Sequence, residues 1–372
     1  MFEGEYLNGK QNGKGKEYYY SGKLMFEGEY INGKKNGKGK EYYYGSELMF
    51  EGEYLNGKRW NGKEYYKNGD LGFQIKNGNG KGKEYYYDGE LIFEGEYLNA
   101  KRWNGKGKIY YSDKIIFEGE YLNGKINGKG KENSFSGNFI FEGEYLNGKK
   151  WNGKIKEYYY EGRLKFEGEY LRGKRNGKGK EYSLDDKLIF EGEYLDGERN
   201  GKGKEYYDGK LIFDGEYLNG KRSGKGKEYY IIDGKLIYAG EFLNGERNGK
   251  GKDYNGDDKL IFDGEYLNGK RNGKGKEYYE DGDLKFEGGY LNAKRNGKGK
   301  EYNKDGKLMF EGEYLNGERN GKGKEYNEDC ELEFEGEYLN GKRNGKGKIY
   351  YNGKLIFESE YSNGKLIKTS IK

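Results

Sequence analysis

The motif F-E-G-E-Y-L-N-G-K-R-N-G-K-G-K-E-Y recurs about every 24 residues along this chain of 372 residues. An aromatic residue opens each copy, at Phe2, Phe26, Phe50, Phe93, Phe117, Phe141, Phe166, Phe190, Phe213, Tyr238, Phe262, Phe286, Phe310, Phe334 and Phe357. A degraded copy occupies residues 73–92, and the last copy, residues 357–372, is truncated. A fixed period in this range indicates one supersecondary unit stacked on copies of itself. We therefore expect residues 1–372 to form a single repeat array, with no stretch left for a separate catalytic domain.

Within one copy, the pattern predicts a β-hairpin. Residues 26–31 alternate aromatic or Gly with Glu, which favours a strand with one covered face. Residues 32–37 contain two Asn-Gly pairs and predict the hairpin loop, and residues 38–44 return as the partner strand. A lone hairpin is marginal in water, so the copies must stack. We expect an all-β fold, an elongated single-layer antiparallel meander of about 15–16 hairpins that forms a twisted, solenoid-like ribbon.

The charges of the motif predict how the two strands pair, because opposite charges directly across strands are favourable and like charges are not. The predicted pairs are Glu27 with Lys40, Glu29 with Lys38, Gly28 with Gly39 and Tyr30 with Gly37. The tyrosine-rich segment does not fit this parity, which indicates a bulge near Tyr42. The structural residues of the repeat are then Phe26, Gly28, Tyr30, Gly37, Gly39 and Tyr42.

Composition limits the chemistry and the location. The chain is 32% hydrophobic and 17% aromatic, so large rings must fill its few buried positions. It has no His, and therefore lacks the usual general base and the commonest metal ligand. Cys330 is the only cysteine, which favours a reducing compartment. No leader or membrane-spanning run is visible, so we expect a cytoplasmic protein that can associate with a membrane or the cytoskeleton.

The motif resembles the MORN repeat (membrane occupation and recognition nexus). The similarity extends over essentially the whole chain, although Asn36 stands where family members commonly carry His, and the Pro of the second turn is absent. The resemblance implies an elongated sheet of hairpins with roles in scaffolding, dimerisation, tethering at membrane junctions and binding of anionic phospholipids. No kinase or methyltransferase domain accompanies the repeats here, so only the scaffold and lipid roles are implied.

The departures from the repeat are the candidate functional positions. Each tryptophan is one extra residue in the long hairpin loop and follows a basic pair. The candidate interface is Trp60 with Lys58 and Arg59, Trp103 with Lys101 and Arg102, and Trp151 with Lys149 and Lys150. Trp beside basic residues at one edge suits a lipid headgroup region or a partner hot spot. The alternative is that each ring folds over its own sheet edge and that the basic edge is only solvated.

Other chemistry is disfavoured. N-G-K-G-K lacks the phosphate-loop pattern, and E-G-E recurs in nearly every copy, where cross-strand lysines explain it. A net charge of +5 argues against nucleic acid. We predict a non-enzymatic scaffold with no cofactor, metal site or catalytic residue, which binds protein partners and can tether them at a membrane surface. The first alternative is direct binding of anionic phospholipids, and a distant one is a cell-wall or glycan-binding array. Homodimers or end-to-end association are expected options.

Overall fold

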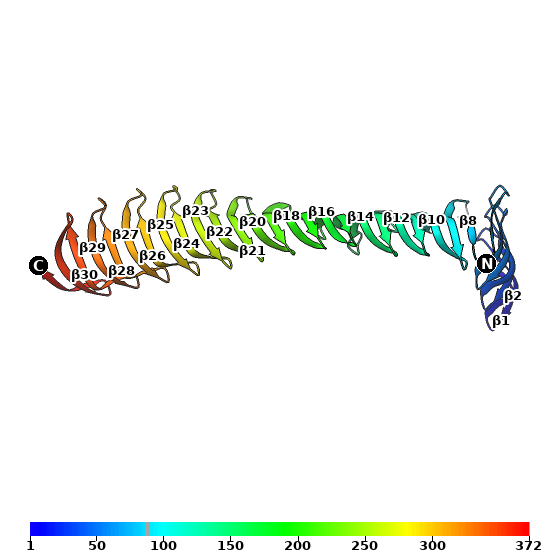
Figure 1. The fold of residues 1–372 in the computed structure, drawn as a ribbon, viewed down its shortest axis with the longest axis horizontal. Helices are drawn as coiled ribbons and strands as arrows, with labels where there is room; N and C mark the ends of the chain where they lie inside the picture. Colours follow the sequence, from blue (N-terminus) through cyan, green and yellow to red (C-terminus); the bar gives the residue numbers. More distant parts are fainter. Residues whose placement is uncertain (86–88, 372) are drawn as a thin grey trace. The chain divides into compact units, whose positions relative to one another are not determined.

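The computed structural model describes residues 1–85 and 89–371, and within these residues every regular element is a β-strand. The predicted degraded copy at residues 73–92 therefore includes three residues, 86–88, that lie outside the described part. The described chain divides into two units, Met1–Arg175 and Asn176–Lys372, with the boundary inside strand β16. Figure 1 shows the strands following one another in chain order within each unit. The predicted all-β antiparallel meander in an open sheet is confirmed.

The strands of the first unit are β1 (Phe2–Leu7), β2 (Lys10–Tyr18), β3 (Leu24–Ile31), β4 (Lys34–Tyr42), β5 (Leu48–Leu55), β6 (Lys58–Tyr65), β7 (Leu71–Ile75), β8 (Gly80–Tyr85), β9 (Leu91–Leu98), β10 (Lys101–Tyr111), β11 (Lys114–Leu122), β12 (Lys125–Asn133), β13 (Phe139–Leu146), β14 (Lys149–Tyr158) and β15 (Leu164–Leu171). Strands β1–β7 make one sheet, and a second sheet begins at β8. A single bridge, between Lys76 and Asn79, lies between β7 and β8.

The remaining strands are β16 (Lys174–Tyr182), β17 (Leu188–Leu195), β18 (Glu198–Tyr207), β19 (Lys210–Leu218), β20 (Lys221–Tyr229), β21 (Leu236–Leu243), β22 (Glu246–Tyr254), β23 (Leu260–Leu267), β24 (Lys270–Tyr278), β25 (Leu284–Leu291), β26 (Lys294–Tyr302), β27 (Leu308–Leu315), β28 (Glu318–Tyr326), β29 (Leu332–Leu339), β30 (Lys342–Tyr351), β31 (Lys354–Ser362) and β32 (Lys365–Ile371). Each strand from β17 to β31 pairs with the next one in antiparallel fashion.

The hairpin turn is shorter than the sequence predicts. In the copy that starts at Phe26, Asn32 and Gly33 alone form the turn, with φ of 52° and 80°. Two successive positive φ values define the turn whose twist matches that of the flanking strands, and Asn-Gly is its preferred sequence. The second pair, Asn36-Gly37, lies inside β4. The prediction of a loop over residues 32–37 is therefore wrong, because one Asn-Gly pair suffices to reverse the chain.

The second Asn-Gly pair makes a bulge that changes part of the predicted register. Glu27 with Lys40 and Gly28 with Gly39 are confirmed, but beyond Gly28 the register shifts and Tyr30 pairs with Lys35. The predicted pairs of Tyr30 with Gly37 and of Glu29 with Lys38 are thus wrong within the hairpin. Equivalent pairs form with the next copy instead, where Gly37 faces Tyr54 and Lys38 faces Glu53. The bulge predicted near Tyr42 is confirmed, since the β4–β5 register shifts there.

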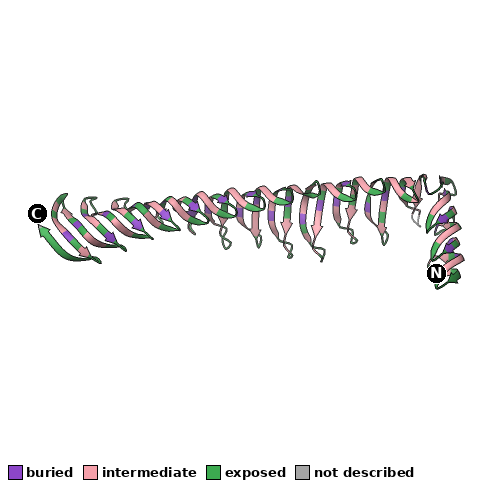
Figure 2. Ribbon diagram, turned by 60° about the horizontal axis from the view of Figure 1, so that its bottom comes forward, coloured by how far each residue is buried: buried purple, intermediate pink, exposed green. Residues whose placement is uncertain are grey.

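A row of glycines across the strands makes room for the core. From β16 to β30, one glycine of each strand pairs with a glycine of the next, as Gly275, Gly288 and Gly299 do. The ring of Phe286 lies over Gly288 and Gly299, where any side chain would overlap it. Phe286 is fully buried and meets Tyr290 and Tyr314 edge to face, at centroid distances of 5.6 and 5.2 Å. The core is therefore one band of rings in mid-strand, and Figure 2 shows buried residues there and exposed turns.

Candidate interaction surfaces

The two faces of the second unit's sheet have different chemistry because side chains alternate along each strand. One face carries the aromatic rings. The opposite face carries the remaining charged residues of the motif, for example Glu287 on β25 and Lys300 on β26, which are directly paired. A side chain at any glycine of the row would point toward the rings. On the polar face, therefore, the row exposes only its backbone. The result is a backbone floor between rows of charged side chains.

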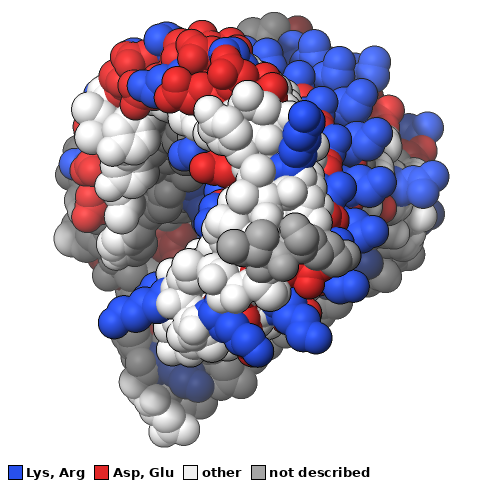
Figure 3. Space-filling view, turned by 90° about the vertical axis from the view of Figure 1, so that its left-hand side faces the viewer, with Lys and Arg blue, Asp and Glu red and all other residues white. Residues whose placement is uncertain are grey.

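A groove of about 1640 Å³ follows this polar face across strands β23–β32. Its floor is the glycine row, and its walls alternate lysine with acidic residues from strand to strand. The cross-strand ion pairs in the walls are loose, as between Lys276 and Glu287 at 3.9 Å and between Lys300 and Glu311 at 4.0 Å, and their side chains remain 34–53% exposed. These charges are therefore available to a partner. Seen from the C-terminal end, the surface is hollowed and shows both signs of charge (Figure 3).

The first unit has a smaller groove of the same construction. It encloses about 780 Å³ over strands β1–β5, with the row Gly4, Gly15, Gly28, Gly39 and Gly52 as its floor. Lysines and glutamates again flank the row. The predicted structural glycines of the repeat therefore have a second consequence, because they leave open the surface on the side that the rings do not occupy.

The aromatic face carries a ladder of arginines and acids that sequence reasoning missed. Arg295 lies over the ring of Phe286, with its guanidinium carbon 4.1 Å from the centroid. The same guanidinium is 2.6 Å from the Glu277 carboxylate on one side and 2.9 Å from Glu301 on the other. The ring and both acids recur at Arg199, Arg222, Arg247 and Arg319. Arg271 and Arg343 also lie over a ring, each with an ion pair to one acid. The recurring spacing of Arg and Glu in the motif was the signal that could have revealed it.

The arginines of the ladder also lower the pKa values of carboxylates that they contact, as at Glu277 and Glu41. Burial alone would raise the pKa of Glu277, but hydrogen bonds from Arg295 and Tyr290 and the charge of Arg295 outweigh burial and lower it. In the first unit, burial opposes the same effect at Glu41, and Arg59 and Lys35 lower the pKa of Glu41 to about 2. These acids are therefore charged at neutral pH and paired inside the fold, which makes them unsuited to acid–base catalysis.

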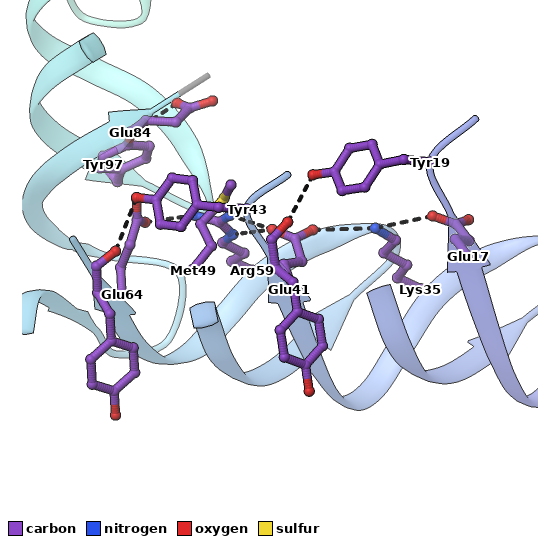
Figure 4. A network of polar contacts seen from close by, with 12 residues as sticks. Glu17, Tyr19, Lys35, Glu41, Tyr43, Met49, Arg59, Glu64, Glu84 and Tyr97 are labelled. Atoms are coloured by element: carbon purple, nitrogen blue, oxygen red, sulfur yellow. Dashed lines mark hydrogen bonds and ion pairs between the residues drawn. The ribbon is translucent and has the colours of Figure 1, made fainter. Parts of the chain in front are cut away.

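One carboxylate of the first unit behaves differently. Glu64 on β6 is 1% exposed, and Arg59 donates to it at 2.6 Å while also binding Glu41 (Figure 4). Among the described residues, no partner reaches its second oxygen. Burial raises the pKa of Glu64 to about 8, Arg59 opposes this shift, and the negative charges of Glu84 and Glu41 add to it. A single guanidinium thus serves two buried acids, and Glu64 titrates near neutral pH.

The three tryptophans lie in strands, so the prediction that they sit in a hairpin loop is wrong. Trp60, Trp103 and Trp151 belong to β6, β10 and β14, and each is half-buried. The ring of Trp60 lies against Gly78 in the turn of the next hairpin, and that of Trp103 lies 3.5 Å from where a Gly124 side chain would start. The alternative of rings folded over the sheet edge describes these two better than exposed loop tips. A role for the tryptophans in binding stays a prediction.

Two of the three tryptophan-containing strands, β10 and β14, also shift the glycine row. In an ordinary hairpin one glycine pairs on both sides, as Gly203 does with Gly192 and Gly215. In β10, Gly105 pairs with the preceding strand and Gly107 with the following one. The extra residue replaces a two-residue bulge by a one-residue bulge, and the pairing then advances by two positions. The row of glycines, and the polar surface above it, is therefore displaced at β10 and β14, whereas in β6 Gly62 pairs with both Gly52 and Ile75 and the row continues.

Only the first residue of each predicted basic pair is exposed at the turn edge of the sheet. Lys58, Lys101 and Lys149, the first residues of the basic pairs, are exposed. The second residues lie on the aromatic face instead, where Arg59 pairs with Glu41, Arg102 with Glu84 at 3.0 Å, and Lys150 with Glu132 at 3.1 Å. Each also lies over the ring that opens its copy. The prediction that Arg59, Arg102 and Lys150 lie at a solvated edge is wrong, because alternation along the strand turns them inward.

The exposed lysines have apolar neighbours that sequence reasoning also missed. The last residue before each turn is usually Leu, paired with the basic or acidic residue that follows the turn, as Leu291 is with Lys294. Leu267, Leu291 and Leu315 are each 50% exposed. The position could have been recognised from the alternation of F-E-G-E-Y-L, which places Leu on the face opposite the rings. We call this line of leucines and lysines the turn edge.

These features define a hairpin-repeat array with a charged groove, and the family comparison agrees. The MORN repeat model matches eleven segments that cover more than half of the chain: residues 2–23, 26–45, 117–139, 166–185, 190–210, 213–232, 238–252, 262–284, 286–307, 310–329 and 334–354. The chain belongs to the MORN repeat family. All three tryptophans lie in the unmatched stretches 46–116 and 140–165. The hairpins that change register are thus also those that depart from the family pattern.

Similarity to solved structures is weak. The crystal structure of TcdB2-TccC3-Cdc42 is 11% identical over 95% of this chain and 22% of that chain, with a TM-score of 0.19. Selenomethionine-substituted virginiamycin B lyase from Staphylococcus aureus is 15% identical over 72% of this chain and 84% of that chain, with a TM-score of 0.13. The chain spans 22% of the former, and neither likeness carries an argument at such TM-scores. No curated protein sequence matches this chain.

Two further properties of the described residues bear on function. They contain no helix long and apolar enough to cross a membrane. They also contain no group of three or more Cys, Asp or Glu side chains placed to hold a metal ion. The surfaces described above are therefore the features on which a functional proposal can be built.

Proposed function

We propose that this chain is a non-enzymatic, cytoplasmic scaffold that binds a polypeptide partner along the groove of its second unit. The groove itself supports this proposal best, because it crosses many strands and exposes loosely paired charges of both signs. Exposed charges arranged in a fixed pattern give an interface specificity and register more than affinity. A linear segment with charges of both signs is the partner that these walls would select.

The test is proximity labelling in native cells with the full chain and two matched double variants. Lys276→Gln with Lys300→Gln removes two charges from the groove, whereas Lys270→Gln with Lys294→Gln removes two from the turn edge. We expect the groove variant to lose specific neighbours that the edge variant retains. Unchanged labelling in the groove variant, with circular dichroism showing both variants folded, would refute the groove as the docking surface.

A second candidate function is direct binding to anionic phospholipids through the turn edge. It is favoured by the exposed leucines beside exposed lysines, such as Leu291 beside Lys294, since each basic residue near an anionic surface contributes about 1 kcal/mol. Flotation with phosphatidylserine vesicles tests it. If the edge binds lipid, Lys270→Gln with Lys294→Gln should weaken flotation and added salt should abolish it, whereas the groove variant should float normally. Equal flotation of both variants would reject this function.

A tryptophan variant can be tested in the same vesicle flotation assay. Changing Trp60, Trp103 and Trp151 together to Ala should reduce flotation only if the half-buried rings contact lipid. Unchanged binding would limit their role to the register of the first unit's strands.

A further inference from the structure

Ordinary hairpins of this array contain an internal anion site at their bulge. In the hairpin β23–β24, the backbone N–H of Lys274 donates to the Glu265 carboxylate at 3.2 Å. The bulge glycine, Gly273, has a φ of 93°, and a side chain there would overlap that carboxylate. The same bond joins Lys202 to Glu193, Lys225 to Glu216 and Lys250 to Glu241, at 3.1–3.4 Å. A bulge of this shape directs backbone N–H groups at an anion, and the chain's own glutamate occupies it.

One hairpin keeps the bulge but lacks the glutamate. In β25–β26 the position is Gly289, in the variant motif F-E-G-G-Y. The bulge glycine of this hairpin, Gly297, retains a positive φ of 80°. No atom lies within 4 Å of the place where its side chain would start, and Gly297 is exposed where Gly273 is half-buried. The bulge is therefore present without the carboxylate that fills its counterpart, but its backbone differs, since the Asn296 carbonyl oxygen occupies the place where a side chain at Gly289 would start.

The surroundings of this open cradle are basic. Lys274 is paired directly across the strands with Gly289, and Lys298 is the residue whose N–H the missing carboxylate would accept. Both lysines line the groove together with Gly289 and Gly297. In the described part of the chain, neither ammonium group has a carboxylate within ion-pair distance. Two lysines thus flank a bulge that has no carboxylate of its own, and Glu313 lies directly across the strands from Lys298.

We propose that this bulge is a binding site for a carboxylate supplied from outside the chain. The N–H of Lys298 donates to it, and the ammonium groups of Lys274 and Lys298 neutralise its charge. A carboxylate is the class indicated, because the same cradle holds a carboxylate in sister hairpins. On a polypeptide ligand the group would be an Asp or Glu side chain or the C-terminal carboxylate. The site needs no particular groove partner, so it can be tested independently of the proposed function.

The test is titration of the full chain, labelled with ¹⁵N and ²H, with sodium acetate at constant ionic strength. We expect the amide resonance of Lys298 to shift and saturate, while that of Lys322, whose hairpin retains Glu313, stays in place. Lys298→Met, which removes one ammonium and keeps the backbone donor, should weaken acetate binding by about tenfold, as loss of one charge-assisted interaction does.

Two exchanges between glycine and glutamate test the site in both directions, by filling one bulge and opening another. Gly289→Glu supplies an internal carboxylate once the Asn296 carbonyl oxygen moves aside for the new side chain, and it should then abolish the response at residue 298. Glu313→Gly opens the next hairpin and should make the Lys322 amide respond to acetate. Thermal unfolding checks that both variants fold. The proposal is overturned if acetate does not shift Lys298 more than Lys322, or if Gly289→Glu responds like the natural chain. Saturation by inorganic phosphate but not by acetate would also overturn it, because the site would then bind another class of anion.

Discussion

Glu64 gives the sharpest prediction, since a buried acid with a raised pKa makes stability depend on pH. We expect Glu64→Gln to remove most of the pH dependence of the first unit between pH 5.5 and 8.5. The folded state holds the proton up to a pKa of about 8, whereas the unfolded chain releases it near 4.5. Stability from the protonated form is therefore complete below the unfolded pKa and is lost as pH rises through the folded one.

The size of the effect follows from the two pKa values. Integrating the proton linkage from pH 5.5 to 8.5 lowers the free energy of unfolding by about 3 kcal/mol. The groups that face Glu64 are Arg59, which favours its charged form, and Glu84 and Glu41, which disfavour it. Since the pKa of Glu41 is lowered to about 2, its contribution is lost only at acidic pH and stays constant across this window.

Trp60 provides the local probe, because it lies in β6 with Glu64. In a background with Trp103 and Trp151 changed to Phe, urea unfolding followed by Trp60 emission should show a midpoint that falls as pH rises. Glu64→Gln should flatten that trend. The matched variant Glu157→Gln, at a ladder acid of the same unit whose pKa is lowered and which does not act on Glu64, should lower stability but keep the slope. Equal slopes with and without Glu64 would refute the reasoning.

The remaining predictions concern the ladder, the glycine row and the tryptophan step. Arg295→Met should cost about 1–3 kcal/mol, because it removes one ion pair from each of two partly buried carboxylates and leaves Glu277 with Tyr290 and Glu301 with Arg319. Lys294→Met should cost under about 0.5 kcal/mol, and hydrogen exchange of the neighbouring strands measures both. Gly299→Ala forces a methyl group to about 2.5 Å from the Phe286 ring and should lower the free energy of unfolding by about 1–3 kcal/mol, while Gly256→Ala, with open space around it, should not. Deleting Trp103 should straighten the glycine row, so that cysteine pairs placed for the ordinary register oxidise in the deletion variant and not in the natural chain.

Much of the fold could be predicted from the sequence because its signals are local and repeated. The alternation around Phe26 and the Asn-Gly pairs indicate a hairpin, and the charges of Glu27 and Lys40 predict their pairing. The wrong prediction of a loop over residues 32–37 also has a local cause. Two Asn-Gly pairs stand close together, and sequence alone does not say that Asn32-Gly33 turns the chain while Asn36-Gly37 makes a bulge.

The candidate sites were harder to predict because they depend on which face a side chain occupies. A bulge inverts the alternation that follows it, so an error of one residue moves Arg59 from an exposed edge to a buried ladder. The half-buried position of Trp60 has the same origin. The groove was missed for another reason, since it belongs to no single hairpin and exists only across many strands.

The repeated motif is enough to specify a β-hairpin array, because every copy carries the same strand, turn and pairing signals. How neighbouring copies pair with one another depends on the three-dimensional fold. That register sets which charges are paired beneath arginines and which line a groove, and it places Lys274 directly across from Gly289. The physical reason is that hydrogen bonds between neighbouring hairpins, and not the order of residues within one, place each row of side chains on its face.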